Sequence, residues 1–447
     1  MKDAILTKIM NRKAKVVIFG LGQVGLPKAA VMAEAGFQVI GVDINLKIVD
    51  GVAKGFINMH ESGLSNLIKQ ATEKGLLKAT SNGNAAVKKA DIILICVPTP
   101  IKGNKTPDLS YIQDVCKTIV HNAIKGKLII VESTLPPKTI KTFIAPMLEE
   151  GSGFKCGLDF WLAYCAERIY PGKTMEEIVE NDKIIGGYNA ESAKVASELF
   201  RTFIKGNILI TDATTAEITK LTENTFRYVN IAFANTLALL CEHLGVDVMD
   251  VIKLSNTHPR VNVHMPSCGV GGPCLPKDPC LLLHPAKSFD SPIIEDARSI
   301  NESMPKHIVN FVLKGFGDLD KKILNSRITV LGTAYKGNVD NSTLSPSKPI
   351  IQKLLDLGAE VIVYDPYCPD SFGAEKTGSL IEAVKDSDCI IVATDHVQFK
   401  KIDLYKLRKL MRDNPIIVDG RRVIDPFEAK KIGFKYYGVG YGTKFNE

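Results

Sequence analysis

Short apolar runs that end at turn residues recur along the first third of the chain, and each has the length of a buried strand. These runs are residues 15–19, 38–42, 91–97 and 127–131. An alanine-rich segment, residues 24–35, separates the first two runs and stops before Gly36, as a helix does. This order of strand, helix and strand predicts a parallel sheet with helices on both faces.

The same order returns near the C-terminus. The second set of runs is residues 327–332, 361–365, 388–393 and 415–419. Four strands match in order and in the residues that end them, and a repeat this long excludes a solenoid. The sequence therefore predicts an α/β protein with two Rossmann-like, doubly wound parallel-sheet domains.

A long helical pattern lies between the two sets of strands, from about Thr214 to Gly245. Thr214 and Glu217 have the spacing of a capping box, which marks a helix N-terminus. About 30 residues of helix would span roughly 45 Å, enough to join two domains or to pair with a second subunit. The alternative is a core helix within one domain.

Composition narrows the class of protein. The chain has 447 residues, which suggests roughly three domains or two large ones. Its formal charge of +7, with 23% charged residues, excludes disorder as the main state and fits an anionic small ligand better than nucleic acid. The sequence shows neither a signal peptide nor a membrane span, and its ten cysteines are expected to be reduced thiols of a cytoplasmic protein.

A glycine motif follows the first predicted strand and opens the first predicted helix. The motif is Gly20-Leu21-Gly22-Gln23-Val24-Gly25, and Asp43 ends the next strand 18 residues later. In this context the glycines admit a pyrophosphate and the acid accepts hydrogen bonds from a ribose while repelling a ribose phosphate. The motif therefore predicts NAD in preference to NADP, and the alternative is a tight turn without a ligand.

The C-terminal copy lacks this motif, since residues 332–337 have no second glycine at the required spacing. Ligands of such sheets collect at the carboxyl ends of the strands, where Lys336, Asp365 and Arg421 are expected. Lys336 and Arg421 are candidates to meet an anionic ligand there. The alternative is that both are solvated loop charges.

Residues 269–278, GVGGPCLPKD, surround one thiol with glycine and proline. A cysteine held in such a loop beside Lys277 is a candidate nucleophile, and this makes Cys274 the central residue of the predicted site. Cys268 and Cys280 flank it, but gaps of five residues do not suit zinc, so no metal is predicted. A buried inert thiol is the other alternative.

An NAD domain combined with a nucleophilic thiol indicates oxidation of an aldehyde through a covalent thioester. An alcohol substrate would then be oxidised twice, which needs acid–base groups and an oxyanion donor. The candidates are Asp278, Glu167 and the helix pair Lys220 and Asn224. On helix spacing alone, Lys220 and Asn224 are more often ordinary solvated residues.

The chain resembles the nucleotide-sugar 6-dehydrogenase family, which oxidises UDP-glucose and UDP-N-acetylhexosamines, over nearly its whole length. The motifs that carry the resemblance are GLGQVG with Asp43, VPTP at 97–100, EST at 132–134, AERIYPG at 166–172, KLTENTFR at 220–227, GVGGPCLPKD and DGR at 419–421. The resemblance implies an irreversible four-electron oxidation of a sugar's primary alcohol to a carboxylate with two NAD.

The resemblance also implies roles for single residues. Cys274 would be the nucleophile, Lys220 and Asn224 would steady the oxyanion, and Lys220 and Asp278 would move protons through a water. Glu167 and Thr134 would position that water and pass protons during thioester hydrolysis. Pro98, Thr99, Thr134 and Lys277 would approach the cofactor. Glu167, Arg168, Lys220, Asn224, Asn262, Gly271, Lys336 and Arg421 would contact the sugar nucleotide, with Arg260 donated across a homodimer interface.

The resemblance divides the chain into an NAD-binding domain (1–212), a central helical dimerisation region with the cysteine loop (213–318) and a UDP-sugar-binding domain (319–447). AERIYPG and HPRVN at 258–262 resemble the N-acetylhexosamine branch of the family. Within it we expect UDP-N-acetyl-D-mannosamine as the substrate, with UDP-N-acetylglucosamine and UDP-glucose left open. More distant alternatives are a single-oxidation hydroxyacid-type dehydrogenase and an NAD-binding protein without turnover. Cys268 is a weak candidate for an oxidative disulfide with Cys274.

Overall fold

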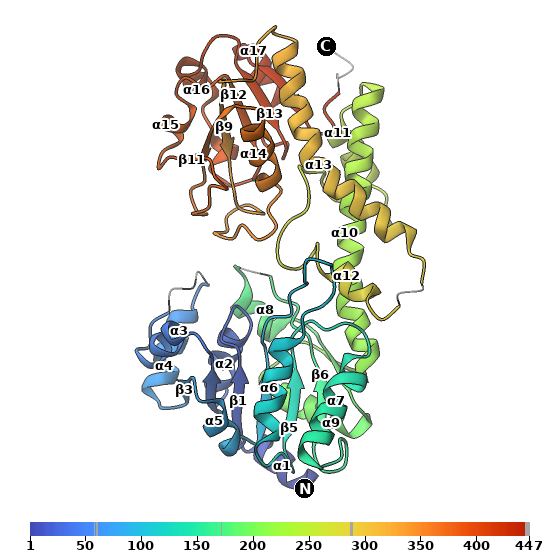
Figure 1. Cartoon of the computed structure of the whole chain (residues 1–447). Coiled ribbons are helices and arrows are strands. Elements are labelled where there is room, and N and C mark those ends of the chain that lie inside the picture. The colour runs from blue at the N-terminus through green and yellow to red at the C-terminus, as the bar shows by residue number, and fades with distance from the viewer. Residues whose placement is uncertain (58, 60, 171, 287–288, 443–447) are drawn as a thin grey trace. The chain divides into compact units, whose positions relative to one another are not determined.

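The computed structural model describes residues 1–57, 59, 61–170, 172–286 and 289–442, and the chain forms two compact units (Figure 1). The first unit comprises Met1–Glu223 and Cys280–Phe289, and the second comprises Asn224–Pro279 and Asp290–Glu447. The long helix α10 (Ala213–Leu244) begins in the first unit and ends in the second. Among the described helices, none combines the length and apolar character that crossing a bilayer requires.

The first unit contains an eight-stranded sheet in the order β3-β2-β1-β4-β5-β6-β7-β8. The strands are β1 (Lys15–Phe19), β2 (Gln38–Val42), β3 (Leu77–Thr80), β4 (Ile92–Ile95), β5 (Leu128–Val131), β6 (Trp161–Tyr164), β7 (Lys183–Gly187) and β8 (Ile208–Asp212). All neighbours are parallel except β6 and β7. The four strands predicted in this part of the chain are confirmed, and β3, β6, β7 and β8 extend the sheet beyond them.

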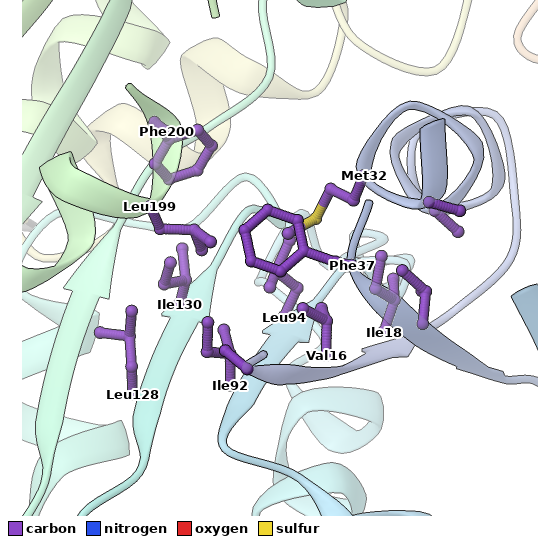
Figure 2. Close-up of a cluster of buried hydrophobic side chains, with 14 of the residues drawn as sticks. Val16, Ile18, Met32, Phe37, Ile92, Leu94, Leu128, Ile130, Leu199 and Phe200 are labelled. Carbon is purple, nitrogen blue, oxygen red and sulfur yellow. The ribbon is translucent and has the colours of Figure 1, made fainter. Parts of the chain in front are cut away.

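Helices cover both faces of this sheet because alternate strand residues point to opposite sides. Val16 and Ile18 of β1 pack in one buried cluster and Val17 and Phe19 in another. The helices are α1 (Lys2–Met10), α2 (Gly25–Glu34), α3 (Leu46–Ala53), α4 (Leu64–Glu73), α5 (Gly83–Lys89), α6 (Ser110–Val120), the π-helix η1 (Ile140–Ile144), α7 (Ala145–Ser152), α8 (Thr174–Glu180) and α9 (Ala190–Phe200). Figure 2 shows the cluster beneath α2 and α9, where Phe37 lies among β1, β4 and β5 side chains.

The second unit contains a six-stranded, all-parallel sheet in the order β11-β10-β9-β12-β13-β14. Its strands are β9 (Arg327–Leu331), β10 (Glu360–Tyr364), β11 (Glu375–Lys376), β12 (Cys389–Val392), β13 (Ile416–Asp419) and β14 (Lys435–Gly438). This order repeats that of β3-β2-β1-β4-β5-β6. The predicted duplication of an α/β domain is therefore confirmed.

Helices of the second unit pack on its sheet and on one another. They are α11 (Val248–Ser255), α13 (Pro292–Gly317), α14 (Ser347–Asp356), α15 (Leu380–Val384), the 3₁₀ helix η2 (Phe399–Lys401), α16 (Leu404–Leu410) and α17 (Pro426–Ile432), while α12 (Asp278–Leu283) crosses the boundary of the two units. One buried cluster joins Ala238 of α10, Val248 of α11 and Ile308 of α13 to Val330 of β9. The C-terminal part of α10 is thereby built into the core of this unit.

The start of α10 differs from the capping box that the sequence suggests. Asp212 caps the helix: its carboxylate accepts bonds from the backbone amides of Thr214 and Thr215 and from the Thr215 hydroxyl. Glu217 turns away from the helix start and accepts bonds from the backbone amides of Lys138 and Ile140. The predicted Thr214–Glu217 capping box is wrong because a residue one position before the helix is the better acceptor and Glu217 meets a distant loop.

Candidate active site

The glycine motif forms a tight turn between β1 and α2. Gly20 has a positive φ of +86°, and a Cβ there would lie 2.7 Å from the Cys96 carbonyl oxygen. A Cβ on Gly25 would lie 1.9 Å from the Gly20 carbonyl oxygen, so no side chain fits at either position. Gly22 is exposed with open space around it, and Val24 provides no side-chain cap to the α2 amides. A phosphate can therefore approach the turn and the helix N-terminus.

Asp43 ends β2 beside this turn and is half-buried. Its Oδ2 accepts a bond of 2.7 Å from the Leu21 amide and its Oδ1 one of 2.8 Å from the Asn45 amide. A carboxylate offers about four acceptor positions, so this pair of bonds leaves room for ribose hydroxyls. The residues of the turn and Asp43 thus fit the NAD that the sequence predicts.

The loops that follow β4 and β5 are tied together next to this turn. The Thr99 hydroxyl donates to the Thr134 carbonyl oxygen over 2.7 Å, and the Ser133 hydroxyl donates to the Val97 carbonyl oxygen over 2.6 Å. Pro98 and Gln23, also predicted to approach the cofactor, are exposed. Since the loops end neighbouring parallel strands, they lie at the same sheet edge as the glycine turn.

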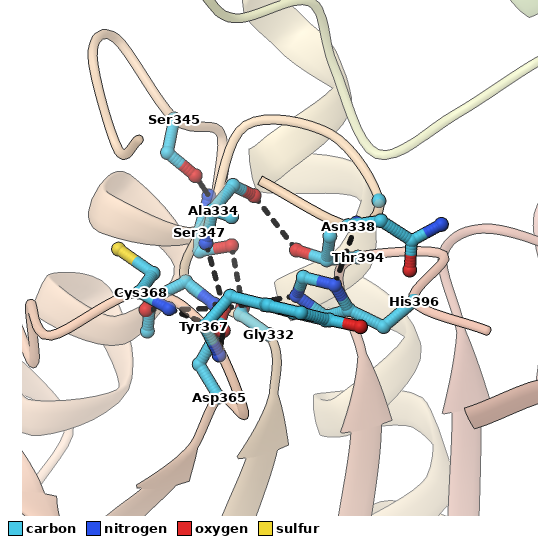
Figure 3. A network of polar contacts seen from close by, with 12 residues as sticks. Gly332, Ala334, Asn338, Ser345, Ser347, Asp365, Tyr367, Cys368, Thr394 and His396 are labelled. Atoms are coloured by element: carbon cyan, nitrogen blue, oxygen red, sulfur yellow. Dashed lines mark hydrogen bonds and ion pairs between the residues drawn. The ribbon is translucent and has the colours of Figure 1, made fainter. Parts of the chain in front are cut away.

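In the C-terminal copy, hydrogen-bond donors of the same domain occupy the acceptor positions of the acid that follows the second strand. The Asp365 carboxylate accepts bonds from the backbone amides of Thr333, Ala334, Tyr367 and Cys368 and lies 3.1 Å from His396 Nε2 (Figure 3). Burial alone would raise the pKa of Asp365, but these donors hold it well below its ordinary value. Asp365 is therefore a structural residue and leaves no place for a ribose.

Arg421 and Lys336 follow strands β13 and β9 of the second unit. Arg421 Nη2 lies 2.6 Å from Asp395 Oδ1, the same oxygen that accepts the Gly337 amide over 3.1 Å. Lys336 Nζ lies 5.8 Å from the ring centroid of Tyr335. Both basic side chains are half-buried, unlike the freely solvated charges of the alternative interpretation.

Cys274 is exposed, so it is not the inert buried thiol of the alternative interpretation. Asp278, at the start of α12, is 1% exposed and accepts a 2.6 Å bond from Asn224 Nδ2, while Lys277 Nζ lies 3.6 Å from its other oxygen. The backbone amides of Lys277 and Asp278 both donate to the Cys274 carbonyl oxygen. These contacts fix the turn on which the thiol stands.

The glycines that precede Cys274 pack against the C-terminal copy. Cβ atoms at Gly271 and Gly272 would lie 2.9 and 2.7 Å from Tyr335 side-chain atoms, and the Gly272 amide donates to the Thr343 carbonyl oxygen. Only glycine allows this approach, which explains the composition of the loop.

Cys268 anchors the beginning of the same loop. It is fully buried, its Sγ lies 3.2 Å from the Ala393 carbonyl oxygen, and burial raises its pKa to about 11. This disfavours Cys268 as the attacking thiolate in a disulfide with Cys274, and that disulfide stays a prediction. Within the described ranges, no three metal-ligating side chains gather as a metal site would require.

Lys220 and Asn224 stand one turn apart on α10 and belong to the first and second unit, respectively. Asn224 is buried and Lys220 is half-buried, so neither is an ordinary solvated side chain. Glu217 and Glu223 lie three residues before and after Lys220. Glu217 holds the loop that follows Thr134 through the Lys138 and Ile140 amides.

Glu223 holds the segment that contains Glu167 and Arg168. Arg168 Nη2 lies 2.8 Å from one Glu223 oxygen and its Nε donates to the other over 3.2 Å. This two-point pairing anchors the Arg168 guanidinium to α10 and leaves other N–H groups of the guanidinium outside the pair. Two loops of the first unit are thus attached to α10 on either side of Lys220.

Glu167 is buried among charged side chains that the sequence did not assign. Lys28 and Lys183 both donate to its carboxylate, and Glu132 lies next to Lys28. The sequence did indicate that two lysines are buried, because Lys28 interrupts an alanine-rich helix and Lys183 opens an apolar strand. A buried lysine rarely lacks a partner. Nothing in the sequence indicated which carboxylate these lysines meet.

The segment with Arg260 and Asn262 is exposed. Asn230 Nδ2 donates to the Asn262 carbonyl oxygen over 2.8 Å. The Asn256 side chain bonds both backbone groups of Val263: its Nδ2 donates to the carbonyl oxygen, and its Oδ1 accepts from the amide. The segment is therefore ordered against α10 and α11 and leaves the Arg260 side chain at the surface.

Comparison with known proteins supplies the family. The chain matches three domains of the UDP-glucose/GDP-mannose dehydrogenase family: the NAD binding domain over residues 14–204, the central domain over 214–303 and the UDP binding domain over 329–426. The chain belongs to this dehydrogenase family. The predicted family resemblance and the predicted NAD cofactor are thereby confirmed, and the protein is an NAD-dependent oxidoreductase.

Individual members of the UDP-glucose/GDP-mannose dehydrogenase family are similar over almost the full length. A UDP-N-acetyl-D-mannosamine dehydrogenase of Pyrococcus horikoshii is 40% identical over 428 residues, which is 96% of this chain and 99% of that protein. A solved structure of a UDP-D-ManNAc dehydrogenase from P. horikoshii has a TM-score of 0.91 at 40% identity and the same coverage. A crystal structure of an NDP-N-acetyl-D-galactosaminuronic acid dehydrogenase from Methanosarcina mazei Go1 has a TM-score of 0.87 at 33% identity, and the match covers 98% of both chains.

Proposed function

We propose that this dehydrogenase oxidises UDP-N-acetyl-D-mannosamine to UDP-N-acetyl-D-mannosaminuronate in two steps, with Cys274 as the covalent nucleophile. The observation that supports the two-step reaction best is the exposed thiol on a turn fixed by Asn224 and Asp278, in a chain with an NAD cradle. The choice of sugar rests on the 40% identity to the P. horikoshii enzyme.

NAD, held by the glycine turn and Asp43, supplies the hydride acceptor, and two molecules are needed for the four electrons removed. In the first oxidation the primary alcohol loses a hydride and a proton and becomes an aldehyde. The Cys274 thiolate then adds to the aldehyde carbon, and Lys220 and Asn224 stabilise the resulting oxyanion. Loss of a second hydride leaves a thioester on Cys274.

Hydrolysis completes the reaction. A water adds to the thioester carbon, the C–S bond breaks, and the thiolate and the sugar carboxylate are released. We assign Lys220 and Asp278 to proton transfer through this water, and Thr134 and Glu167 to its placement. Pro98, Thr99 and Lys277 are assigned to the cofactor.

The sugar nucleotide is assigned to the UDP binding domain, where Lys336 and Arg421 present positive charge at the carboxyl ends of strands. Two basic groups match the two phosphates of UDP. Arg168, Asn262 and Gly271 complete the proposed substrate contacts. The proposed division of the chain is an NAD-binding domain (1–212), a central region (213–318) and a UDP-sugar domain (319–447).

We also propose a homodimer formed through α10. Apolar side chains at Phe226, Phe233, Leu240 and Leu244 are 64%, 53%, 48% and 63% exposed, and the first three recur at seven-residue spacing. Such a stripe on one helix favours a second helix as its partner. In this dimer Arg260 reaches the sugar nucleotide of the partner subunit.

The test is the yield of NADH with a panel of UDP-sugars: the N-acetylmannosamine, N-acetylglucosamine, N-acetylgalactosamine and glucose derivatives. We expect the highest kcat/KM with the N-acetylmannosamine derivative and two NADH per sugar consumed. A yield near one would support the single-oxidation alternative. Absence of NADH with every sugar would support binding without turnover.

A further inference from the structure

We propose that Lys28 and Lys183 are positioning residues that hold the Glu167 carboxylate as a permanent anion at the beginning of the segment that follows β6. This inference rests on the proposed function, in which Glu167 places the hydrolytic water. It adds that Glu167 accepts hydrogen bonds throughout the reaction and neither gives nor takes a proton.

Four charged side chains form the cluster, and all are buried: Lys28 and Lys183 are 0% exposed, Glu132 is 4% and Glu167 is 7% exposed. Lys28 Nζ lies 2.6 Å from Glu167 Oε2 and 3.3 Å from Glu132 Oε1. Lys183 Nζ donates to Glu167 Oε1. The two lysines and two glutamates balance in charge, as a buried cluster requires.

The topology explains why these side chains meet. In the antiparallel pair of β6 and β7, Tyr164 is opposite Gly186 and Ala163 is opposite Gly187. The same register, continued beyond the end of β6, brings Lys183 opposite Glu167. Lys28 comes from the first turn of α2, three residues after the last glycine of the NAD motif. The cluster thus connects the cofactor-binding helix to the segment with Glu167.

The bonds of Glu167 limit what it can do. Oε1 accepts from Lys183 and, over 2.9 Å, from the Arg168 amide, while Oε2 accepts from Lys28. Three of the roughly four acceptor positions of a carboxylate are filled by donors, so one position remains for a water hydrogen. A carboxylate in this setting orients a water and fixes the Arg168 backbone, and it has no proton to donate.

The charges around Glu167 favour the same state. Burial opposes ionisation, but the two lysines outweigh it and lower the pKa of Glu167 to about 2. The other titratable groups that face the cluster are Glu132, whose pKa burial raises, and the thiols of Cys96 and Cys165, whose pKa burial also raises. Cys96 Sγ lies 3.7 Å from Glu132 Oε2.

The experiment compares Lys183→Met, Lys183→Arg and Lys28→Met with the wild type. Lys127→Met is the matched control, because Lys127 is also a buried lysine of the first unit but donates to the Ala90 carbonyl oxygen. Each variant is assayed for kcat and KM from pH 4.5 to 9, and mass spectrometry of the quenched enzyme measures the acyl group on Cys274.

We expect Lys183→Met to lower kcat by about 10-fold or more with little change in either KM, because misplaced water slows hydrolysis while binding persists. Acyl-enzyme should accumulate. Glu167 should then add an acid limb at the low-pH end of the kcat profile that the wild type lacks there, because losing one adjacent opposite charge raises a carboxyl pKa by about 1–3. Lys183→Arg should restore both kcat and the profile.

The proposal is overturned if Lys183→Met keeps the wild-type kcat and pH profile, or changes only in stability as Lys127→Met does. If Lys28→Met does not fold, the two Lys183 variants decide. Failure of the proposed function is recognised separately in the wild-type enzyme: a yield of one NADH per sugar would reject the two-step reaction whatever the lysine variants do.

Discussion

Asp43 and Asp365 occupy the same place in the two copies of the α/β domain. Each follows the second strand of its sheet, and each accepts a 2.7 Å bond from the backbone amide of the turn after the first strand, at Leu21 and Thr333, respectively. Asp43 has one further amide donor, whereas Asp365 has three further amides and His396. Asp43 therefore keeps acceptor positions for a ligand, whereas donors of its own domain occupy those of Asp365.

Asp43→Asn should therefore weaken NAD binding without unfolding the protein. Loss of charged hydrogen bonds to the ribose is worth about 1.5–3 kcal/mol, which corresponds to about a 10- to 100-fold higher Kd. Discrimination against NADP should fall as well. Titration calorimetry with both cofactors measures the change.

Asp365→Asn is the matched control for this experiment. It should leave the Kd for NAD near the wild-type value and lower the Tm, because buried amides and His396 lose an anionic acceptor. Equal effects of the two substitutions on the Kd would contradict the difference between the two acids.

Cys274→Ser should stop the reaction before the carboxylate is formed. A serine hydroxyl is a far weaker nucleophile than a thiolate, so no thioester can carry the second oxidation. The product is analysed by mass spectrometry together with the NADH yield. Cys268→Ser is the control and should retain two NADH per sugar. The serine hydroxyl can still donate to the Ala393 carbonyl oxygen, as the Cys268 thiol does. Undiminished carboxylate from Cys274→Ser would remove this thiol from the mechanism.

Glu217 should make the stability of the first unit depend on pH. Burial raises its pKa from 4.5 to about 7, despite the amide donors of Ile140 and Lys138. Between these values the folded protein keeps a proton that the unfolded chain has released, so the contribution is complete below pH 4.5 and is lost as the pH rises through 7. The loss amounts to about 3 kcal/mol.

Glu217→Gln cannot titrate and provides the reference for that effect. The unfolding free energy of the wild type relative to this variant should decrease from pH 4.5 to 7.5 and then level off. Parallel stability curves for the two proteins across this range would show that Glu217 does not titrate there.

Phe233→Glu should separate the subunits of the proposed dimer. A charge placed in the apolar stripe of α10 would have to be buried without a partner. Sedimentation should give the monomer mass of 48.8 kDa, and activity should fall by about 10-fold or more if Arg260 acts across the interface. Leu158→Glu, at a residue of the first unit that is 74% exposed, should leave the mass unchanged.

Local patterns in the sequence were enough to predict the repeated strands and the long helix. The runs at 15–19 and 38–42 match β1 and β2 to the residue, because apolar strands between turn residues have few alternatives. The strand β8 escaped prediction although Ile208, Leu209 and Ile210 are apolar, since it lies at the sheet edge and is partly exposed. Edge strands carry a weaker pattern than central ones.

The charged cluster could not be predicted because its partners are distant in sequence. Lys28 and Glu167 are 139 residues apart, and Lys138 and Glu217 are 79 residues apart. Motif spacing identifies residues that share a loop or a helix face, as with Cys274 and Asp278. It carries no information on which buried lysine neutralises which carboxylate, since that depends on the order of the strands in the finished sheet.

The chain crosses three times between its two compact units, so the protein cannot be divided by one cut. The boundaries fall at 223/224, 279/280 and 289/290, so neither unit is one continuous segment. A single cut at the 223/224 boundary within α10 would leave Lys220 on one fragment and Asn224 on the other, and would strip residues 280–289 from the unit to which they belong. Expressing the NAD-binding part alone therefore requires a redesigned connection, and proteolytic nicking of this helix should inactivate the enzyme irreversibly.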